Sequence, residues 1–440
     1  MSSKTKTTTT KEAVTRARVP KLRFPEFRGV EGWKATQLQR IARPVSDRAV
    51  TGDGDNVLSL SGEHGLVLQS DYFGKKVAGD SAERYLKLLR DDFVYNDRTT
   101  KASTFGTIKR LSKYSGGIVS PIYKCFRFHA DENAVFWEWY FESGSHDAAL
   151  GGLVNEGARA GRFNISISQF LSTSAWRPDE PEQQKIAKCL SSVDELMAAQ
   201  ALKVDALKTH KKGLMQQLFP REGETQPRLR FPEFQNAGEW DESELGPKTT
   251  KVGSGITPSG GDKNYKQSGR PFVRSQNVGW GVLLLDDVAY IDDETHASFD
   301  STEIKVRDVL LNITGASIGR SAVADDRVVG GNVNQHVCII RTKPDELNPL
   351  FLNQFLICQR GQKLIDSFQA GGNRQGLNFA QIRSFAIPLP PKKLEQQRIA
   401  SCLRSLDALI NAETQELEAL KTHKKGLMQQ LFPSPEDADV

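Results

Sequence analysis

The sequence predicts an α+β protein in which two mixed α/β domains are separated by two long helices, which form an antiparallel coiled coil with pseudo-two-fold symmetry. One observation is an internal duplication, because residues 206–220 and 419–433 both read ALKTHKKGLMQQLFP. A second is the heptad spacing of apolar residues that leads into both copies. A third is a shorter repeat, LRFPEF, at 22–27 and 229–234, followed each time by a tryptophan, Trp33 or Trp240. Repeats of this kind constrain the architecture before single elements are assigned.

The two long helices are predicted from the duplicated segment and the residues before it. The similarity continues upstream without a gap to EQQKIA at Glu182 and EQQRIA at Glu395. Prolines, which are compatible with helix starts and end helices, flank both copies. The predicted apolar seam consists of Ile186, Leu190, Val193, Met197, Val204, Leu207, Ile399, Leu403, Leu406, Ile410, Leu417 and Leu420. Two helices with matching seams most simply pair with each other; the alternative is two unrelated amphipathic helices on separate cores.

These marks divide the chain into six parts. They are a basic tail expected to be disordered (1–20), a first domain (21–180), a helix (181–220), a second domain (221–393), a helix (394–433) and a short tail (434–440). Inside the domains, which otherwise look unlike each other, β-rich runs are predicted at 65–69, 116–128, 306–314 and 336–342. Helices are predicted at 81–91 and 348–368, with Asn348 as the N-cap of the second.

Composition favours a soluble, cytoplasmic protein. The chain has 38% hydrophobic and 26% charged residues and no apolar run long enough to cross a membrane. Its N-terminus is polar, so no secretory signal is expected. The five cysteines include no CxxC pair, which favours reduced thiols and no zinc site. A formal net charge of +5 permits a nucleic-acid partner without requiring one.

No catalytic motif is recognisable. A DNA methyltransferase that flips its target base would need an [NDS]-P-P-[FYW] turn, and the nearest strings, at Ser120 and Asn348, lack the second proline. There is no P-loop for ATP, and the seven histidines show no HxxxH or HExxH spacing for a metal. We therefore expect neither catalytic residues nor a metal site.

Basic, amide and aromatic residues cluster in both domains beside glycines. Arginine and lysine suit phosphates and guanine edges, while asparagine and glutamine suit adenine. For any single residue, a solvated loop is the simpler interpretation, but the clusters together predict DNA-recognition loops. The candidates are Tyr72, Lys75, Lys76, Lys109, Arg110, Lys113, Tyr114, Arg270, Arg274, Ser275, Gln276, Asn277, Arg320, Asn334, Gln335, His336, Asn373, Arg374 and Gln375.

The chain resembles the specificity (S) subunits of type I restriction–modification systems over about residues 22–433. The resemblance is carried by the paired LRFPEF…W starts, by GLNFAQIRSFAIPLPP at 376–391 and by the duplicated LKTHKKGLMQQLFP. The second domain also has GITPS at 255–259, followed by SQNV and GLN. The first domain departs from the pattern at its end, where GRFNISISQFLSTSAWRP leaves the last strand and the linker open.

The resemblance implies two target recognition domains, each reading one half of a split, asymmetric DNA sequence, with the helices fixing the gap. It implies double-stranded DNA, two methyltransferase (M) subunits and restriction (R) subunits as partners, in a complex that methylates adenine at N6 and defends against phage. S-adenosylmethionine, ATP and Mg are expected on the partner subunits, and no cofactor on this chain. The alternatives are a coiled-coil DNA-associated scaffold without sequence preference and a self-sufficient DNA methyltransferase or nuclease.

Overall fold

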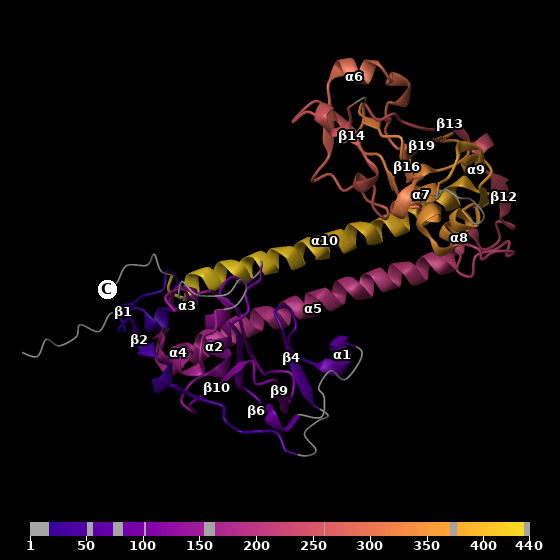
Figure 1. The fold of residues 1–440 in the computed structure, drawn as a ribbon. Coiled ribbons are helices and arrows are strands. Elements are labelled where there is room, and N and C mark those ends of the chain that lie inside the picture. Colours follow the sequence, from indigo (N-terminus) through magenta and orange to yellow (C-terminus); the bar gives the residue numbers. More distant parts are fainter. Residues whose placement is uncertain are drawn as a thin grey trace, which may run out of the picture. The chain divides into compact units, whose positions relative to one another are not determined.

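A computed structural model describes residues 17–50, 56–73, 82–100, 103–153, 163–258, 260–369 and 376–434. The chain divides into two compact units. Unit 1 comprises Met1–Ala199 with Glu416–Val440, and unit 2 comprises Gln200–Gln415. The long helices α5 (Glu180–Leu218) and α10 (Lys393–Leu431) are each continuous in Figure 1, so each helix contributes to both units.

The described strands of unit 1 form sheets in the orders β1-β2-β11, β3-β10-β7-β8 and β5-β4-β9-β6. The strands are β1 (Ala17–Arg18), β2 (Trp33–Gln37), β3 (Ala42–Pro44), β4 (Val57–Ser61), β5 (Gly65–Leu68), β6 (Leu86–Leu89), β7 (Phe93–Asn96), β8 (Thr107–Arg110), β9 (Gly116–Val119), β10 (Lys124–Phe128) and β11 (Ser174–Arg177). The shorter α-helices are α1 (Gln69–Phe73), α2 (Ala134–Glu142), α3 (Asp147–Gly151) and α4 (Ile167–Ser172).

The described strands of unit 2 form sheets in the orders β12-β20, β13-β19-β16-β17 and β15-β14-β18. The strands are β12 (Asp241–Glu244), β13 (Thr249–Ser254), β14 (Arg270–Val273), β15 (Ala289–Ile291), β16 (Val309–Asn312), β17 (Ser321–Val323), β18 (Asn332–Val333), β19 (Val337–Thr342) and β20 (Ala386–Leu389). The shorter α-helices are α6 (Asp293–Ala297), α7 (Pro349–Ile357), α8 (Gln359–Ser367) and α9 (Phe379–Arg383).

The central four-stranded sheets of the two units share one plan despite their different sequences. In unit 1 the fully buried Asp92, just before β7, binds Arg127 of β10 through two hydrogen bonds of 2.5 and 2.8 Å. In unit 2 the fully buried Asp308, just before β16, binds Arg341 of β19 through two bonds of 2.7 Å. The duplication therefore extends through the domains and is not confined to the repeated motifs.

The long helices run antiparallel within each unit. In unit 1, Asp194 of α5 pairs with Lys424 of α10 at 2.6 Å. In unit 2 the equivalent residues, Lys211 and Asp407, pair at 2.5 Å. None of the predicted seam residues is exposed, so the seam faces inward. Ile186, Leu190, Val204, Ile399 and Leu403 are buried, and Val193, Met197, Leu207, Leu406, Ile410, Leu417 and Leu420 are half-buried. The predicted fold class is confirmed.

The LRFPEF repeat anchors each unit to the start of a long helix. The Arg23 guanidinium forms two bonds, of 2.8 and 2.7 Å, to the Glu182 carboxylate. Arg230 binds Glu395 in the same way, at 2.7 and 2.8 Å. All four side chains are buried, so both ion pairs are shielded from water.

The end of the first domain has the same structure as the end of the second. Helix α4 begins with a capping box between Ser166 and Gln169, and α9 begins with one between Asn378 and Gln381. Strand β11 then pairs with β2, as β20 pairs with β12. The segment that the sequence left open therefore carries the expected last strand.

Two predicted helices differ from the structure. The prediction for 81–91 is wrong, because β6 occupies residues 86–89 and buries Leu86 and Leu88 against β9. This alternation has the period of a strand, and sheet pairing outweighs helix propensity here. The predicted helix 348–368 is two helices that break at Cys358, whose backbone is extended. A Cβ at Gly361 would lie 2.0 Å from the Phe355 carbonyl oxygen, so the break requires glycine there. Asn348 caps α7 as predicted.

Candidate nucleic-acid interface

Polar loops of unit 2 gather where β14, β16 and β18 end and β19 begins. Asn312, the last residue of β16, donates from Nδ2 to the Ser275 carbonyl at 2.8 Å. The Ile313 N–H donates to the His336 carbonyl at 3.0 Å. These bonds join segments that lie far apart in sequence. We call the result the loop edge of unit 2; it consists of residues 274–277, 314–320 and 334–336.

A fourth segment enters the loop edge of unit 2 at Gly376. Gly376 forms a β-bridge with Thr314, and the Leu377 N–H donates to the Ile313 carbonyl at 2.9 Å. The candidates Asn373, Arg374 and Gln375 directly precede this bridge but lie outside the described residues. The structure thus brings three predicted segments to one edge, where Gly376 also lies, and direct DNA contact by the predicted residues stays a prediction.

Within the first loop, the candidate side chains converge on Asp287. Asn277 is fully buried, and its Nδ2 donates to Asp287 Oδ1 at 2.8 Å and to the Leu284 carbonyl at 2.9 Å. Arg274 donates to the Asp287 carbonyl at 2.5 Å, and the exposed Gln276 also binds the Asp287 carboxylate. In this conformation Asn277 holds the loop together, whereas Gln276 is accessible to a partner.

The other two loops offer more accessible groups. The half-buried Arg320 makes no side-chain hydrogen bond or ion pair to any residue that the structure describes. Gln335 is exposed, and His336 is oriented by a contact of 2.6 Å between its Nδ1 and Thr314 Oγ1. Asn334 is buried and accepts the His336 N–H at 3.1 Å. A cation, an amide and an imidazole are therefore presented on a fixed backbone.

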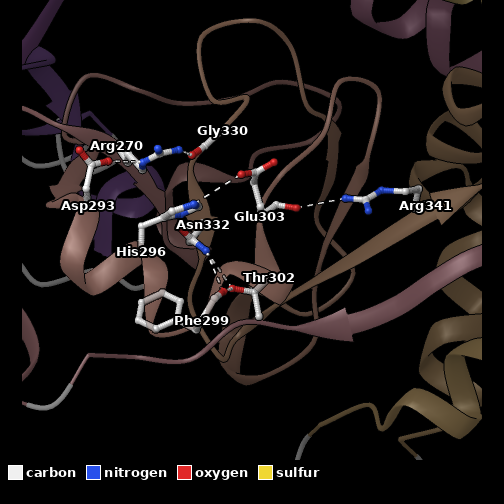
Figure 2. Close-up of polar contacts among 9 residues, drawn as sticks. All are labelled: Arg270, Asp293, His296, Phe299, Thr302, Glu303, Gly330, Asn332 and Arg341. Carbon is white, nitrogen blue, oxygen red and sulfur yellow. Dashed lines mark hydrogen bonds and ion pairs between the residues drawn. The ribbon is translucent and has the colours of Figure 1, made fainter.

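Arg270 lies away from this edge. Figure 2 shows its guanidinium bound to Asp293 at 2.6 Å and to the Gly330 carbonyl at 2.9 Å. In the same view, the buried Asn332 of β18 accepts a hydrogen bond of 2.7 Å from His296 Nδ1. Arg270 is the first residue of β14, whereas the loop edge of unit 2 begins after its last residue. Its contacts hold the sheet margin together.

Unit 1 has an equivalent edge that the sequence did not reveal. Asn96 is the last residue of β7, as Asn312 is the last residue of β16. The Phe163 N–H donates to the Asp97 carbonyl at 3.2 Å, which corresponds to the bond from the Leu377 N–H to the Ile313 carbonyl. Beside it, a groove is lined by Asn96, Arg98, Thr100, Ser103, Thr104 and Thr107, among others. Arg98 is exposed, and its side chain makes no hydrogen bond or ion pair to the residues that the structure describes. We call residues 97–100 and 103–106 the loop edge of unit 1.

Two predicted residues of unit 1 lie on β8, and one of them, Lys109, also lines this groove. Lys109 binds Glu142 of α2 at 2.6 Å, and Arg110 binds Glu138 of α2 at 2.8 Å. Burial raises the pKa of Glu138, and the Arg110 charge opposes that shift. Both basic residues therefore fasten β8 to α2, although their contact with DNA stays untested.

Of the remaining candidates of unit 1, Lys113 lies at the β4–β5 turn. The exposed Lys113 donates to the His64 carbonyl at 3.0 Å, and Tyr114 packs on the core below the turn. Tyr72 of α1 is exposed. Lys75 and Lys76 lie outside the described residues.

The chemistry of the described part gives no metal or thiol centre. No group of three His, Cys, Asp or Glu side chains that could hold a metal occurs among the described residues. Burial raises the pKa of the Cys338 thiol to about 12 and also raises that of Cys358. No helix in the described ranges is long and apolar enough to cross a membrane.

Comparison with known proteins gives a consistent result. Residues 251–422 match the family described as "Type I restriction modification DNA specificity domain". The MjaX type I restriction enzyme specificity subunit of Methanocaldococcus jannaschii is 25% identical over 271 residues, 61% of this chain and 60% of that protein. The MjaVIII specificity subunit of the same organism is 24% identical over 264 residues, 58% of this chain and 60% of that protein. The aligned region thus spans about 60% of both relatives.

Among solved structures, the type I restriction–modification S subunit from M. genitalium is similar in fold. It aligns with a TM-score of 0.57 at 13% sequence identity, covering 94% of this chain and 99% of that chain. This likeness concerns the fold, whereas the matched family model and the two relatives confirm the resemblance predicted from the sequence.

Proposed function

Because residues 251–422 belong to the family of type I restriction modification DNA specificity domains, we propose that this chain is the DNA-recognition subunit of a type I restriction–modification complex. It reads a bipartite, asymmetric target in double-stranded DNA and performs no catalysis itself. It works in the cytoplasm as part of a defence against phage. Neither a self-sufficient methyltransferase or nuclease nor a scaffold without sequence preference is supported by the relatives found.

The observation that carries this proposal is that the two units share one central sheet but differ in the side chains of their loop edges. Both units have the same central sheet and the same buried Asp–Arg pair. Their loop edges differ, since unit 1 offers Arg98 and threonines, while unit 2 offers Arg320, Gln335 and His336. Direct readout depends on which side chains face the base edges. Two such sheets with different loops suit a target whose two halves have different sequences.

The duplicated helix segment supports a second part of the proposal, which is that the chain binds two identical partner subunits. A buried helix face needs only apolar residues of suitable size, so it does not explain identity at exposed positions. Yet Lys208, Thr209, His210, Lys212, Gln216 and Gln217 are exposed in unit 2, and their identical counterparts Lys421, Thr422, His423, Lys425, Gln429 and Gln430 are exposed in unit 1. We propose that each copy binds one methyltransferase (M) subunit, and that restriction (R) subunits join this complex. S-adenosylmethionine, ATP and Mg would then be bound by those partners.

Charge reversal in one copy of the segment should remove one M subunit. Lys212→Glu or Lys425→Glu alone should leave one M subunit bound, and the double variant should leave none. Each lysine is exposed and makes no hydrogen bond or ion pair to the described residues, so its charge is available to a partner. Native mass spectrometry of the co-expressed complex measures the stoichiometry. Lys188→Glu, exposed on α5 outside the duplicated segment, is the control. Two M subunits retained by the double variant would contradict the docking proposal.

Arg320→Gln should weaken DNA binding equally for all sequences. We expect the slope of log affinity against log salt concentration to fall by about 0.9, the value for one lost phosphate contact. The matched control is Lys305→Gln, exposed before the other end of β16. Binding is measured as a salt titration of the complex on duplex DNA. If the salt slope changed equally in Arg320→Gln and Lys305→Gln, the loop edge of unit 2 would not be the DNA-contacting surface.

A further inference from the structure

Trp280 is the one strongly exposed tryptophan of this chain. All six tryptophans lie in the described ranges, and Trp33, Trp137, Trp139 and Trp240 are buried. Trp176 is half-buried beneath the Arg18 guanidinium, 4.7 Å from its ring. Trp280, in contrast, is 52% exposed. An indole held in water forgoes much of the apolar contribution to stability that its burial would give.

The backbone holds Trp280 rigidly. It stands in the turn 279–282, which is closed by a bond of 2.9 Å from the Gly279 N–H to the Val282 carbonyl. The next residue, Gly281, donates to the Ser321 carbonyl at 2.8 Å. Gly281 has φ of 82°, and a Cβ there would come 3.2 Å from Ile357 Cδ1, so the turn packs directly on α7. An aromatic side chain on a fixed turn loses little entropy on binding a partner.

The turn joins the loop edge of unit 2. Trp280 forms a β-bridge with Ser321, the residue after Arg320. The Arg320 carbonyl in turn accepts the Asn312 N–H at 2.9 Å, which ties this corner to the end of β16. Trp280, whose aromatic ring is exposed, is therefore bridged to the residue that follows Arg320, and the Arg320 guanidinium makes no hydrogen bond or ion pair to the described residues. Phosphate attracts such a cation, and every base offers a face for stacking.

We propose that Trp280 is a DNA wedge, which enters a groove of the target duplex and stacks on a partly opened base step while Arg320 binds the flanking phosphate. This inference rests on the proposed function and adds a contact to it. Inserted apolar side chains unstack and kink the duplex, and pyrimidine–purine steps open most easily. The step beside the half-site of unit 2 should therefore be TA, CA or TG, which adds specificity without a hydrogen bond to a base.

The test uses the indole as its own probe. The full chain in complex with its M subunits is titrated with a duplex that carries the target sequence, identified beforehand as the sequence that the complex methylates. Tryptophan emission is compared between wild type and Trp280→Phe, so that the emission of all other tryptophans cancels. We expect DNA to quench the tryptophan emission of the wild-type complex, and we expect this quenching to be absent in Trp280→Phe. Trp280→Ala should lower affinity about tenfold or more with an unchanged salt slope, because stacking carries no charge. Trp176→Phe, in unit 1, should keep the quenching.

The outcomes separate this inference from the function on which it rests. Equal quenching in wild type and Trp280→Phe, or an affinity of Trp280→Ala within twofold of wild type, would overturn the wedge alone. An emission change caused by the M subunits without DNA, and unaltered by DNA, would overturn it in favour of a protein contact. Failure of wild type to distinguish the target from a scrambled duplex would overturn the proposed function and the wedge together.

Discussion

Glu395→Ala is expected to destabilise unit 2 by about 3–5 kcal/mol, and Glu182→Ala to destabilise unit 1 by a similar amount. Each carboxylate is buried and forms two bonds to a buried arginine of the LRFPEF repeat. Removing it leaves the guanidinium of Arg23 or Arg230 inside the protein without a counter-charge. The cost comes from that uncompensated charge and exceeds the net contribution of the intact pair.

Urea unfolding followed by circular dichroism measures this effect. Glu416→Ala and Glu195→Ala, which remove exposed carboxylates from the same two helices, are the controls and should change stability by less than about 0.5 kcal/mol. Replacing both members of a pair, Arg230→Met with Glu395→Leu, should recover most of the loss, because no buried charge remains. A loss below about 1 kcal/mol for Glu395→Ala would show that the pair behaves as a surface salt bridge.

Acid is expected to destabilise unit 1 through His146. The ring is buried among Tyr140, Phe141 and Phe170, and burial lowers the pKa of His146 from 6.5 to about 3. Its Nε2 lies 3.0 Å from Thr173 Oγ1, which itself donates to the Phe170 carbonyl, so Nε2 carries the proton of a neutral imidazole. The Nδ1 atom has no partner among the described residues. This ring therefore stays neutral while the fold is intact.

The sign of the pH effect follows from that lowered pKa. Above pH 6.5 the folded and unfolded states bind the same number of protons at this site, but below it only the unfolded state becomes protonated. Stability is therefore lost as pH falls from 6.5 toward 3, by about 1.4 kcal/mol per pH unit and on the order of 4–5 kcal/mol in total.

His146→Phe should remove this pH dependence while keeping the aromatic packing. Relative to wild type, the variant should gain about 2 kcal/mol of stability between pH 7.5 and pH 5, measured by denaturant unfolding at both values. The comparison with wild type cancels the titration of other groups that both proteins share. His129→Gln, which removes an exposed histidine, is the control and should follow wild type. A parallel pH profile for wild type and His146→Phe would contradict the account.

The long helices could be predicted because the sequence signals for them lie within the helical segments and next to them. A heptad seam and flanking prolines are visible in any short window, and the identical segments mark both copies. The LRFPEF repeat was visible too, but its role was not, since Arg23 and Glu182 are 159 residues apart. The shared sheet was hidden for the same reason. The buried pairs that identify this sheet form only after folding; they are Asp92 with Arg127 and Asp308 with Arg341.

The candidate site shows the same limit. Lys109 and Arg110 were chosen for their charge, and only the fold reveals the α2 carboxylates that pair with them. Asn277 was chosen for its amide, which the folded loop uses internally. Arg98 and Trp280 were missed because each stands alone in sequence. The available signal was positional, because Arg98 closely follows the end of a buried strand and Trp280 stands between two glycines.

Single-molecule methylation sequencing of a plasmid that carries this gene with the gene for its M subunit tests most directly whether this chain reads a split target. We expect N6-methyladenine on both strands of one split motif, whose halves have different sequences and are separated by a fixed run of unread bases. Exchanging only the loop edge of unit 2 should alter one half and leave the other unchanged. Methylation of an uninterrupted motif, or none although the two proteins co-purify in a stable complex, would contradict this expectation.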